Sequence, residues 1–376
     1  MTIRICLVCS EIFAWGKYGG YGRSTRMLGR ELVKRGVEVV AVVPRRPGQQ
    51  PVESLDGMRV LSFAPHSLRE AQDCYAQAAC DIYHSQEATL GSYLAQRAAP
   101  GARHVISFRD QKLWRDWLVE ISLPSQSRLK TLLAAVYECN PLVRRAVLKA
   151  DRLLCVSPHL QEPIRRAYGL DAVPEFLGSP IHVPARAPAK SATPLVCFVG
   201  RLDPRKRPER FIALASRFPE VQFIMAGTAQ NTRYESALRR QATGLSNLQM
   251  SGFLQQFDDP ALQVMLERSW VLVNTSAREG LPTSMLEALA QSCALLSQAD
   301  VAGVAGRFGR HATDGDFERG LAQLLEGSAW QRLGEQGHDY AQRNFDSNAV
   351  LARHLSLYAE LLGGVPQNLA VRAAVT

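Results

Sequence analysis

The chain has 376 residues, of which 46% are hydrophobic and 21% charged, a balance that fits a globular protein and excludes a largely disordered one. The length favours two domains. The formal net charge is +9, and residues 1–180 carry most of it, with 24 basic and 17 acidic side chains. This excess predicts either an anionic partner or a solubilising surface.

Strand-like apolar runs alternate with helical patterns along the whole chain. In the first half we expect strands at residues 5–9, 37–43, 58–63, 81–85, 104–108 and 152–157, and in the second half at residues 195–200, 221–227, 248–253, 270–275 and 293–298. A helix from Ser24 to Arg35, closed by Gly36, is expected between the first two strands. The nearly continuous apolar runs are typical of parallel strands covered on both faces.

A segment rich in proline, with Pro184, Pro188 and Pro194, separates the two halves. Its composition is that of a linker. The simplest interpretation is two doubly wound α/β domains, residues 1–180 and 194–345, joined by a linker at 181–193. In such sheets ligands bind outside the carboxyl ends of the strands, so the segments that follow strands are expected to hold the functional residues.

The first such segment is GKYGGYGRST, residues 16–25, after the first strand. Its glycines would let backbone amides approach a phosphate or sugar, or they serve only a structural turn. Thr25 stands where a dinucleotide fingerprint needs its third glycine, and no acidic residue follows the second strand, so NAD is disfavoured. Arg45 and Arg46 follow the second strand and could bind a ribose phosphate, so NADP stays an alternative.

The second segment is VGRLDPRKRPE, residues 199–209, again directly after a strand. Arg201 and Lys206 lie five positions apart across a turn that contains Pro204. Two such cations at a strand end can neutralise a diphosphate, although a solvated basic loop would look the same. Lys206 is the one lysine beyond residue 190, where 17 arginines occur, which favours a chemical need for it.

The third segment is NTSAREGLPTSMLEALA, residues 274–290. Glu279 is expected in the loop after a strand and Glu287 within the following helix, which Pro282 would begin. The backbone amides expected at the start of that helix belong to Gly280, Leu281 and Thr283. Such amides can hold a phosphate while the carboxylates hold hydroxyls, unless Glu287 merely pairs with a structural arginine.

Together these three motifs resemble those of the retaining glycosyltransferases of family 4, which have the GT-B fold, an α/β fold of two Rossmann-like domains that face each other across a cleft. DIYHSQE (81–87) and ADRLLCVSPHL (150–160) extend the likeness in the first half. FDSNAVLARHLSLYAELL (345–362) resembles the helix that closes the family's fold by crossing back to the first domain. Residues 346–376 are therefore expected to form this helix and a tail.

The resemblance implies a retaining transfer of sugar from a nucleotide-diphosphate sugar, UDP- or GDP-linked, to a hydroxyl of a saccharide, lipid-linked or small-molecule acceptor. It implies that Arg201 and Lys206 bind the diphosphate, that Glu287 binds the ribose and that Glu279 contacts the transferred sugar. The implied donor-binding set is Gly20, Gly22, Arg201, Lys206, Gly280, Leu281, Pro282, Thr283 and Glu287. Neither a metal nor a cofactor is implied.

The departures from the family pattern fall on the acceptor side. Arg109, followed by Asp110, stands where the family often has a histidine near the transferred sugar, and Gln86 replaces a second histidine. We count Arg109 with Glu279, Arg201 and Lys206 as candidate catalytic residues. Candidate acceptor residues are Gly19, Tyr21, His84 and Asp110.

Two alternatives remain open, a non-catalytic GT-B partner subunit and a GT-B nucleotide-sugar epimerase. A glycogen-type phosphorylase is disfavoured because it needs a lysine in the second domain to hold its cofactor. Lys206 is the one lysine beyond residue 190, and it is already assigned to the phosphate turn. Nucleic-acid binding is not expected, since aromatic and basic residues are not interleaved.

Metal sites are not expected either. Cys6 and Cys9 would point to opposite faces of one strand, and no second pair accompanies them. Asp314 and Asp316 precede an amphipathic helix and are interpreted as capping residues rather than metal ligands.

The N-terminal segment lacks the apolar run of a signal peptide, and no run reaches the ~18 residues of a membrane span. We therefore expect a cytoplasmic protein. Residues 112–152 contain Trp114, Trp117 and an excess of basic side chains. They predict two helices whose apolar face, formed by Leu129, Leu132, Leu133 and Val136, packs on the first domain or docks on an anionic membrane.

Overall fold

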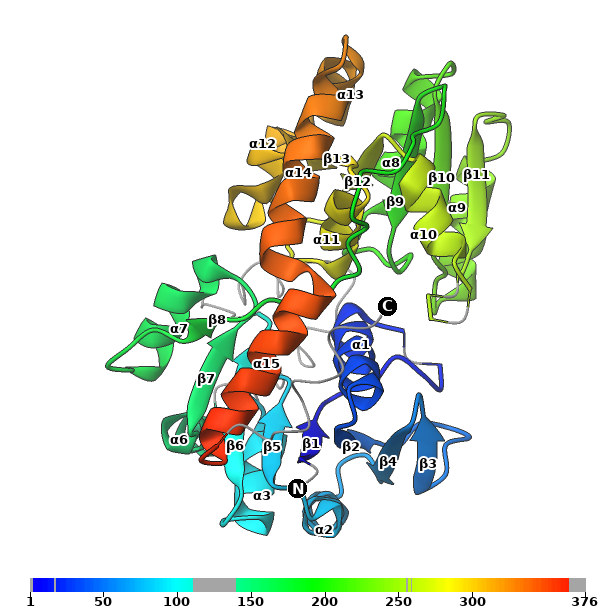
Figure 1. Ribbon diagram of the computed structural model, residues 1–376. Helices are drawn as coiled ribbons and strands as arrows, with labels where there is room; N and C mark the ends of the chain where they lie inside the picture. The colour runs from blue at the N-terminus through cyan, green and yellow to red at the C-terminus, as the bar shows by residue number, and fades with distance from the viewer. Residues whose placement is uncertain (1–2, 17, 111–139, 255, 258, 365–376) are drawn as a thin grey trace. The chain divides into compact units, whose positions relative to one another are not determined.

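The computed structural model describes residues 3–16, 18–110, 140–254, 256–257 and 259–364. The tryptophans at 114 and 117 and the apolar face expected at 129–136 lie outside these residues. The chain divides into two compact units, one of residues 1–180 with 347–376 and one of residues 181–346 (Figure 1).

The first unit is built on an eight-stranded sheet in the order β3-β4-β2-β1-β5-β6-β7-β8. Its strands are β1 (Arg4–Val8), β2 (Glu38–Pro44), β3 (Val52–Leu55), β4 (Met58–Phe63), β5 (Ile82–Ser85), β6 (Arg103–Phe108), β7 (Arg152–Cys155) and β8 (Glu175–Phe176). All pairings are parallel except that of β3 with β4. The six expected strands are confirmed, and the short edge strands β3 and β8 were missed because they lack a buried apolar run.

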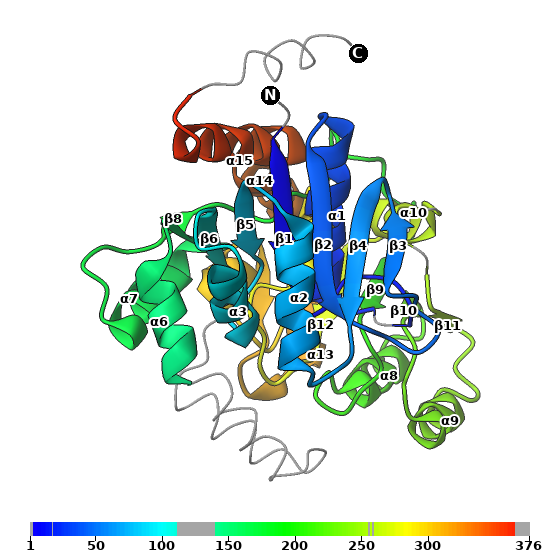
Figure 2. The same cartoon turned by 90° about the horizontal axis from the view of Figure 1, so that it is seen from below.

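Helices cover both faces of this sheet. They are α1 (Gly20–Lys34), α2 (Leu68–Ala78), α3 (Leu90–Ala98), α6 (Pro141–Lys149), α7 (Gln161–Tyr168) and α15 (Ser347–Leu361), with a 3-10 turn at Pro158–Leu160. Leu7 packs on the face covered by α1 and α15, and the adjacent Cys6 packs on the face covered by α2 and α3 (Figure 2). This alternation explains why the strands are apolar on both faces.

The second unit has a six-stranded parallel sheet in the order β11-β10-β9-β12-β13-β14. The strands are β9 (Leu195–Val199), β10 (Gln222–Ala226), β11 (Leu248–Gly252), β12 (Val271–Asn274), β13 (Ala294–Ser297) and β14 (Gly309–His311). The five expected strands are confirmed. The three-residue strand β14 is too short for a sequence pattern to show.

The helices of the second unit are α8 (Pro208–Arg217), α9 (Thr232–Gln241), α10 (Ala261–Arg268), α11 (Thr283–Ala290), α12 (Val304–Arg307), α13 (Phe317–Leu325) and α14 (Ala329–Phe345), with 3-10 turns at Val301–Gly303 and Thr313–Gly315. The strand order is the 3-2-1-4-5-6 order of dinucleotide-binding folds. The direction of winding reverses between β9 and β12, and the first sheet has the corresponding reversal between β1 and β5.

The segment expected as a linker packs against the second unit. Ile181 donates its backbone N–H to Phe345, and the side chains of Ile181 and Val183 are buried. Lys190 donates to the backbone carbonyls of Leu266 and Gln291. The proline-rich composition predicted a linker, but it could not show these contacts, which depend on residues far along the chain.

Candidate functional site

The sequence motifs of the second unit gather at the reversal point of its sheet. β9 and β12 are paired neighbours, with Val196 opposite Val271. Because the strands are parallel, their carboxyl ends lie at the same edge. The segments that follow them, which contain Arg201 and Lys206 in one case and Glu279 in the other, therefore start side by side.

Asp203 organises the turn after β9. Its backbone carbonyl accepts a hydrogen bond from the amide of Lys206 at 2.9 Å, and its carboxylate accepts one from the amide of Arg205 at 3.0 Å. The same carboxylate lies 3.7 Å from the guanidinium of Arg201. The turn thus presents Arg201 and Lys206 on a backbone that is fixed by hydrogen bonds.

Lys206 and Glu279 form an ion pair between the two segments. Glu279 is only 11% exposed and Lys206 26% exposed, so the pair is partly shielded from water. Asn274, the last residue of β12, lies 3.4 Å from the same carboxylate oxygen. The hydroxyl of Thr275 donates to the backbone carbonyl of Lys206 at 2.5 Å and so fastens the turn to the end of β12.

The two carboxylates of the third motif differ in placement as expected. Glu279 precedes α11, and Glu287 lies within it, 9% exposed. Pro282 is the N-cap of α11 and not its first helical residue, which corrects the expected position by one. Within the described residues, the backbone N–H groups of Gly280 and Leu281 make no hydrogen bond.

The glycine-rich segment of the first unit is not the loop that the sequence predicted. Helix α1 begins at Gly20, four residues before the expected start, with Gly19 as its N-cap. A side chain at position 22 would approach the backbone of Ile12 and Phe13 to 2.9 Å, so close packing requires Gly22. The glycines bring the start of the helix against the segment that follows β1.

The carboxylate of Glu11 sits at the N-terminus of this helix. It accepts a hydrogen bond from the amide of Gly22 at 2.9 Å. A Cβ added to Gly19 would lie 2.2 Å from the same carboxylate oxygen. The protein thus places its own anion where the glycines suggested a ligand phosphate, and the donor contact of Gly20 and Gly22 stays a prediction.

His84 is a core residue of the first unit. It is fully buried in β5, and its ring nitrogens lie 2.7 Å from the hydroxyls of Tyr358 and Ser107. Burial lowers the pKa of His84 well below its usual range, and the nearby His354 and Arg109 act in the same direction. Both ring nitrogens are engaged within the first unit, which is typical of a core histidine, and the acceptor-side assignment of His84 stays a prediction.

Arg109 follows β6 at the carboxyl edge of the first sheet and is 8% exposed. It donates to the side chain of Gln86 and to its backbone carbonyl, and also to the hydroxyl of Ser179. The two departures from the family pattern, Arg109 and Gln86, are therefore direct partners. Asp110 is partly exposed beside Arg109, and Tyr21 is exposed in the first turn of α1.

Sequence reasoning missed three residues that hold the candidate site in place by hydrogen bonds. Glu11, Asp203 and Asn274 each hold a residue or segment of the candidate site in place. Each is a polar residue within four positions of a strand's carboxyl end, and this position was the signal that could have found them.

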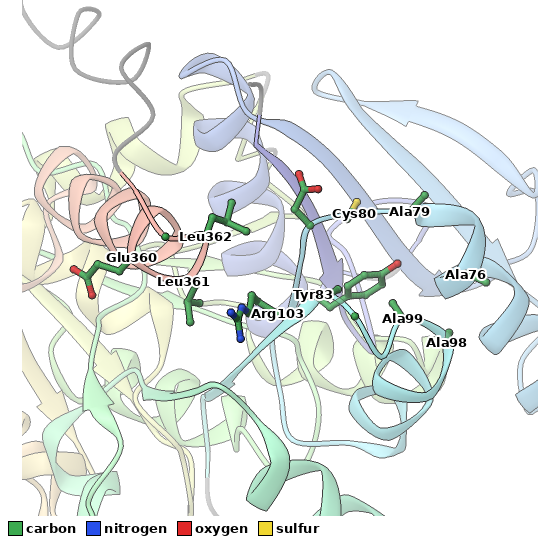
Figure 3. A pocket seen from close by; sticks show the side chains of 14 residues that line it. Ala76, Ala79, Cys80, Tyr83, Ala98, Ala99, Arg103, Glu360, Leu361 and Leu362 are labelled. Atoms are coloured by element: carbon green, nitrogen blue, oxygen red, sulfur yellow. The ribbon is translucent and has the colours of Figure 1, made fainter.

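A cavity of about 640 Å³ opens at the opposite edge of the first sheet (Figure 3). It lies where β5 and β6 begin and where α15 ends, between Tyr83, Arg103 and Leu361. Its charged side chains already have partners, since Asp81 pairs with Arg4, Arg103 pairs with Asp151 and Glu360 accepts a hydrogen bond from the Ser356 hydroxyl. None of the candidate residues lines it, so it is not the site that the motifs define.

Asp316 caps α13 by accepting a hydrogen bond from the amide of Arg319, as expected. In the part of the chain that the structure describes, no three histidine, cysteine or acidic side chains are grouped as metal ligands. None of the helices described is both long and apolar enough to cross a membrane.

Comparison with known proteins identifies the class. Residues 19–177 match the family described as glycosyl transferase 4-like domain, and residues 184–323 match the family of glycosyl transferases group 1. The chain is a glycosyltransferase, an enzyme with the GT-B fold of two Rossmann-like domains. A sequence search among curated proteins finds no match.

Solved structures with low sequence identity share the fold over nearly the whole chain. Sucrose-phosphate synthase from Thermosynechococcus elongatus aligns with a TM-score of 0.71 at 17% identity, covering 96% of this chain and 99% of that one. HepE from Anabaena, in complex with UDP-glucose, aligns with a TM-score of 0.65 at 15% identity, covering 94% and 100%. The catalytic domain of starch synthase IV from Arabidopsis thaliana, bound to ADP and acarbose, aligns with a TM-score of 0.62 at 12% identity, covering 96% and 100%.

Proposed function

We propose that the chain transfers a sugar, with retention of configuration, from a UDP- or GDP-sugar to a hydroxyl of a saccharide, lipid-linked or small-molecule acceptor. The observation that carries this proposal is the contact of Lys206 with Glu279 at the reversal point of the second sheet. The Lys206 cation can bind a diphosphate, and the Glu279 carboxylate can accept a hydrogen bond from a sugar hydroxyl. The two lie together at the edge where such sheets bind ligands. Complexes with UDP-glucose and with ADP among the structural relatives support a nucleotide donor.

On the donor side, Arg201 and Lys206 bind the two phosphates of the donor. Arginine supplies a planar fork and lysine a point charge, and both neutralise the charge that develops on the leaving diphosphate. The backbone amides of Gly280 and Leu281 lie next to the start of α11 and make no hydrogen bond within the described residues. They can therefore donate to the same diphosphate. Glu287 accepts hydrogen bonds from the ribose hydroxyls.

In the transfer step, the acceptor oxygen attacks the anomeric carbon from the side on which the diphosphate leaves. The departing phosphate oxygen accepts the acceptor's proton, so the protein supplies no separate base. Glu279 holds the transferred sugar by a hydroxyl. The protein then acts mainly by positioning the reactants and by electrostatic stabilisation, and it needs no metal.

A thermal-shift series tests the proposal most directly. A nucleotide that binds only the folded protein raises its melting temperature. We expect UDP or GDP to raise it, and ADP, TDP and CMP to raise it less, with and without EDTA. Loss of the shift in EDTA would contradict metal independence. No shift with any nucleotide would favour a non-catalytic partner subunit.

The stereochemistry of the product tests retention separately. With a donor and acceptor identified from the binding series, proton NMR of the product distinguishes the two anomers. We expect the anomer of the donor sugar to be kept. Inversion would contradict front-side attack, and release of an altered sugar in the absence of any acceptor would favour the epimerase alternative.

We further propose that the enzyme meets an anionic membrane through the outer face of α6. Leu142 and Leu148 are exposed on this helix, 37% and 53% respectively, beside the exposed cations of Arg145 and Lys149. Exposed apolar side chains among basic ones are typical of helices that lie in the membrane interface. Flotation with phosphatidylglycerol vesicles should capture the protein, and a Leu142→Ser/Leu148→Ser variant should float less. Equal recovery with neutral vesicles would contradict the proposal.

A further inference from the structure

Arg109 is a buried cation with uncharged partners. Its Nε donates to the backbone carbonyl of Gln86 at 3.1 Å, its Nη1 donates to the hydroxyl of Ser179 at 3.2 Å, and its Nη2 donates to the Gln86 side-chain oxygen. Within the described residues no carboxylate forms an ion pair with it. Buried charges in proteins are normally paired, because removing an ion from water costs several kcal/mol.

The nearest carboxylates do not neutralise Arg109 directly. Burial lowers the pKa of its guanidinium, and the charges of Glu87 and Glu11 oppose this from farther away. Glu87 accepts a hydrogen bond from the Ser10 hydroxyl at 2.7 Å, and Glu11 accepts one from the amide of Gly22 at 2.9 Å. Each carboxylate is therefore engaged by another donor.

The hydrogen bonds of Arg109 leave one N–H on each terminal nitrogen without a partner among the described residues. A guanidinium with an N–H left on each terminal nitrogen can bind a phosphate or carboxylate in a bidentate pair. Gln86 and Ser179 already fix the guanidinium, so little side-chain entropy is lost when an oxyanion binds.

Arg109 also lies at the correct edge for a ligand. It follows β6, the strand next to β5, at the carboxyl ends of the first sheet beside the reversal point between β1 and β5. Arg109 is 8% exposed, so solvent reaches part of the residue.

We infer that Arg109, held by Gln86 and Ser179, binds an oxyanion of a soluble acceptor, a phosphate or a carboxylate, and so determines acceptor specificity. The inference rests on the proposed function, because it takes the bound group to be part of the acceptor. The arginine that replaces a histidine of the family pattern then selects a charged acceptor.

Binding of minimal probes to the full-length protein tests the inference. The protein is saturated with UDP, so that the cations of the second unit are occupied, and is titrated calorimetrically with inorganic phosphate, glucose 6-phosphate, glucuronate and glucose. The variants are Arg109→Gln, Arg109→Lys and, as a matched exposed control on α2, Arg69→Gln. We expect at least one oxyanion to bind while glucose does not.

In Arg109→Gln this oxyanion should bind roughly tenfold more weakly or not at all, since one charge-assisted pair is lost. Arg109→Lys keeps the charge but loses the planar guanidinium, so its affinity for the oxyanion should be intermediate. This variant provides the test if Arg109→Gln does not fold. Arg69→Gln should match the wild type. Equal oxyanion binding by wild type and both Arg109 variants, or no oxyanion binding by the wild type, would overturn the inference. Failure of UDP itself to bind would instead count against the proposed function.

Discussion

The ammonium group of Lys206 contacts the carboxylate of Glu279, although the two residues lie 73 positions apart in the chain. Both follow strands that are neighbours at the reversal point of the second sheet. A diphosphate and Glu279 would then compete for the same cation. The effects expected of changes at Lys206 and at Glu279 follow from this competition.

Replacing Lys206 with alanine should weaken binding of the nucleotide diphosphate. A hydrogen bond to a charged group contributes about 1.5–3 kcal/mol, which corresponds to roughly a 10- to 100-fold rise in Kd. The loss also leaves the Glu279 carboxylate without its cation, which adds repulsion toward a phosphate. Titration calorimetry with UDP measures the effect, and Lys149→Ala, at an exposed lysine of the first unit, is the control. An unchanged Kd in Lys206→Ala would refute the assignment.

Replacing Glu279 with glutamine should separate binding from transfer. The variant frees Lys206 from its ion pair, so UDP should bind as tightly as in the wild type or more tightly. Turnover should fall by at least roughly tenfold, because the carboxylate no longer holds the transferred sugar. UDP affinity and the rate of sugar transfer are measured on the same preparation. Unchanged turnover would contradict the assignment of Glu279 to the transferred sugar. A loss of UDP affinity as large as the loss of turnover would make Glu279 a donor-binding residue only.

Replacing Glu287 with alanine should remove discrimination between ribose and deoxyribose. The carboxylate is 9% exposed within α11 and is assigned to the ribose hydroxyls. The wild type should bind UDP roughly tenfold more tightly than 2′-deoxy-UDP, and the variant should bind both with the weaker affinity. If the variant kept the preference for UDP, Glu287 would be a structural residue.

Gly227 should not tolerate a side chain. Its φ is +149°, and a Cβ there would lie 1.8 Å from the carbonyl oxygen of Gly200. We expect Gly227→Ala to lower the free energy of unfolding by roughly 2–4 kcal/mol, since the backbones at the ends of β9 and β10 must move apart. Chemical denaturation measures the change. Gly101→Ala, where nothing lies within 4 Å, should have little effect, and equal losses in both variants would contradict the close-packing argument.

Two buried histidines should make the fold less stable in mild acid. Burial lowers the pKa of His354 to about 4, and it also lowers the pKa of His84 well below its usual range. Below the unfolded value of about 6.5 the unfolded chain binds protons that the folded chain does not, so stability falls as the pH decreases. Each histidine contributes a slope of at most about 1.4 kcal/mol per pH unit.

The slope can be measured by denaturation between pH 6.5 and 4. His354→Gln should reduce it, whatever its effect on stability at neutral pH. A slope identical to that of the wild type would show that His354 does not carry the effect.

Much of the fold, and the gathering of the second unit's motifs at one edge of its sheet, could be predicted from the sequence. Parallel strands buried on both faces require continuous apolar runs, so eleven strands were visible along the chain. Arg201, Lys206 and Glu279 follow such strands, and the carboxyl ends of parallel strands must meet at one edge. Local chemistry and the rules of strand order therefore suffice to place these three residues near one another.

Tertiary structure alone decided the rest, because it depends on contacts between distant residues. Glu11 occupies the start of α1, His84 is enclosed by Tyr358 from the end of the chain, and Arg109 is buried against Gln86 and Ser179. The sequence shows a glycine, a histidine or an arginine after a strand, but it does not show which partner satisfies it. Whether such a group serves the core or a ligand depends on burial and on neighbouring charges, which arise only when distant segments pack together.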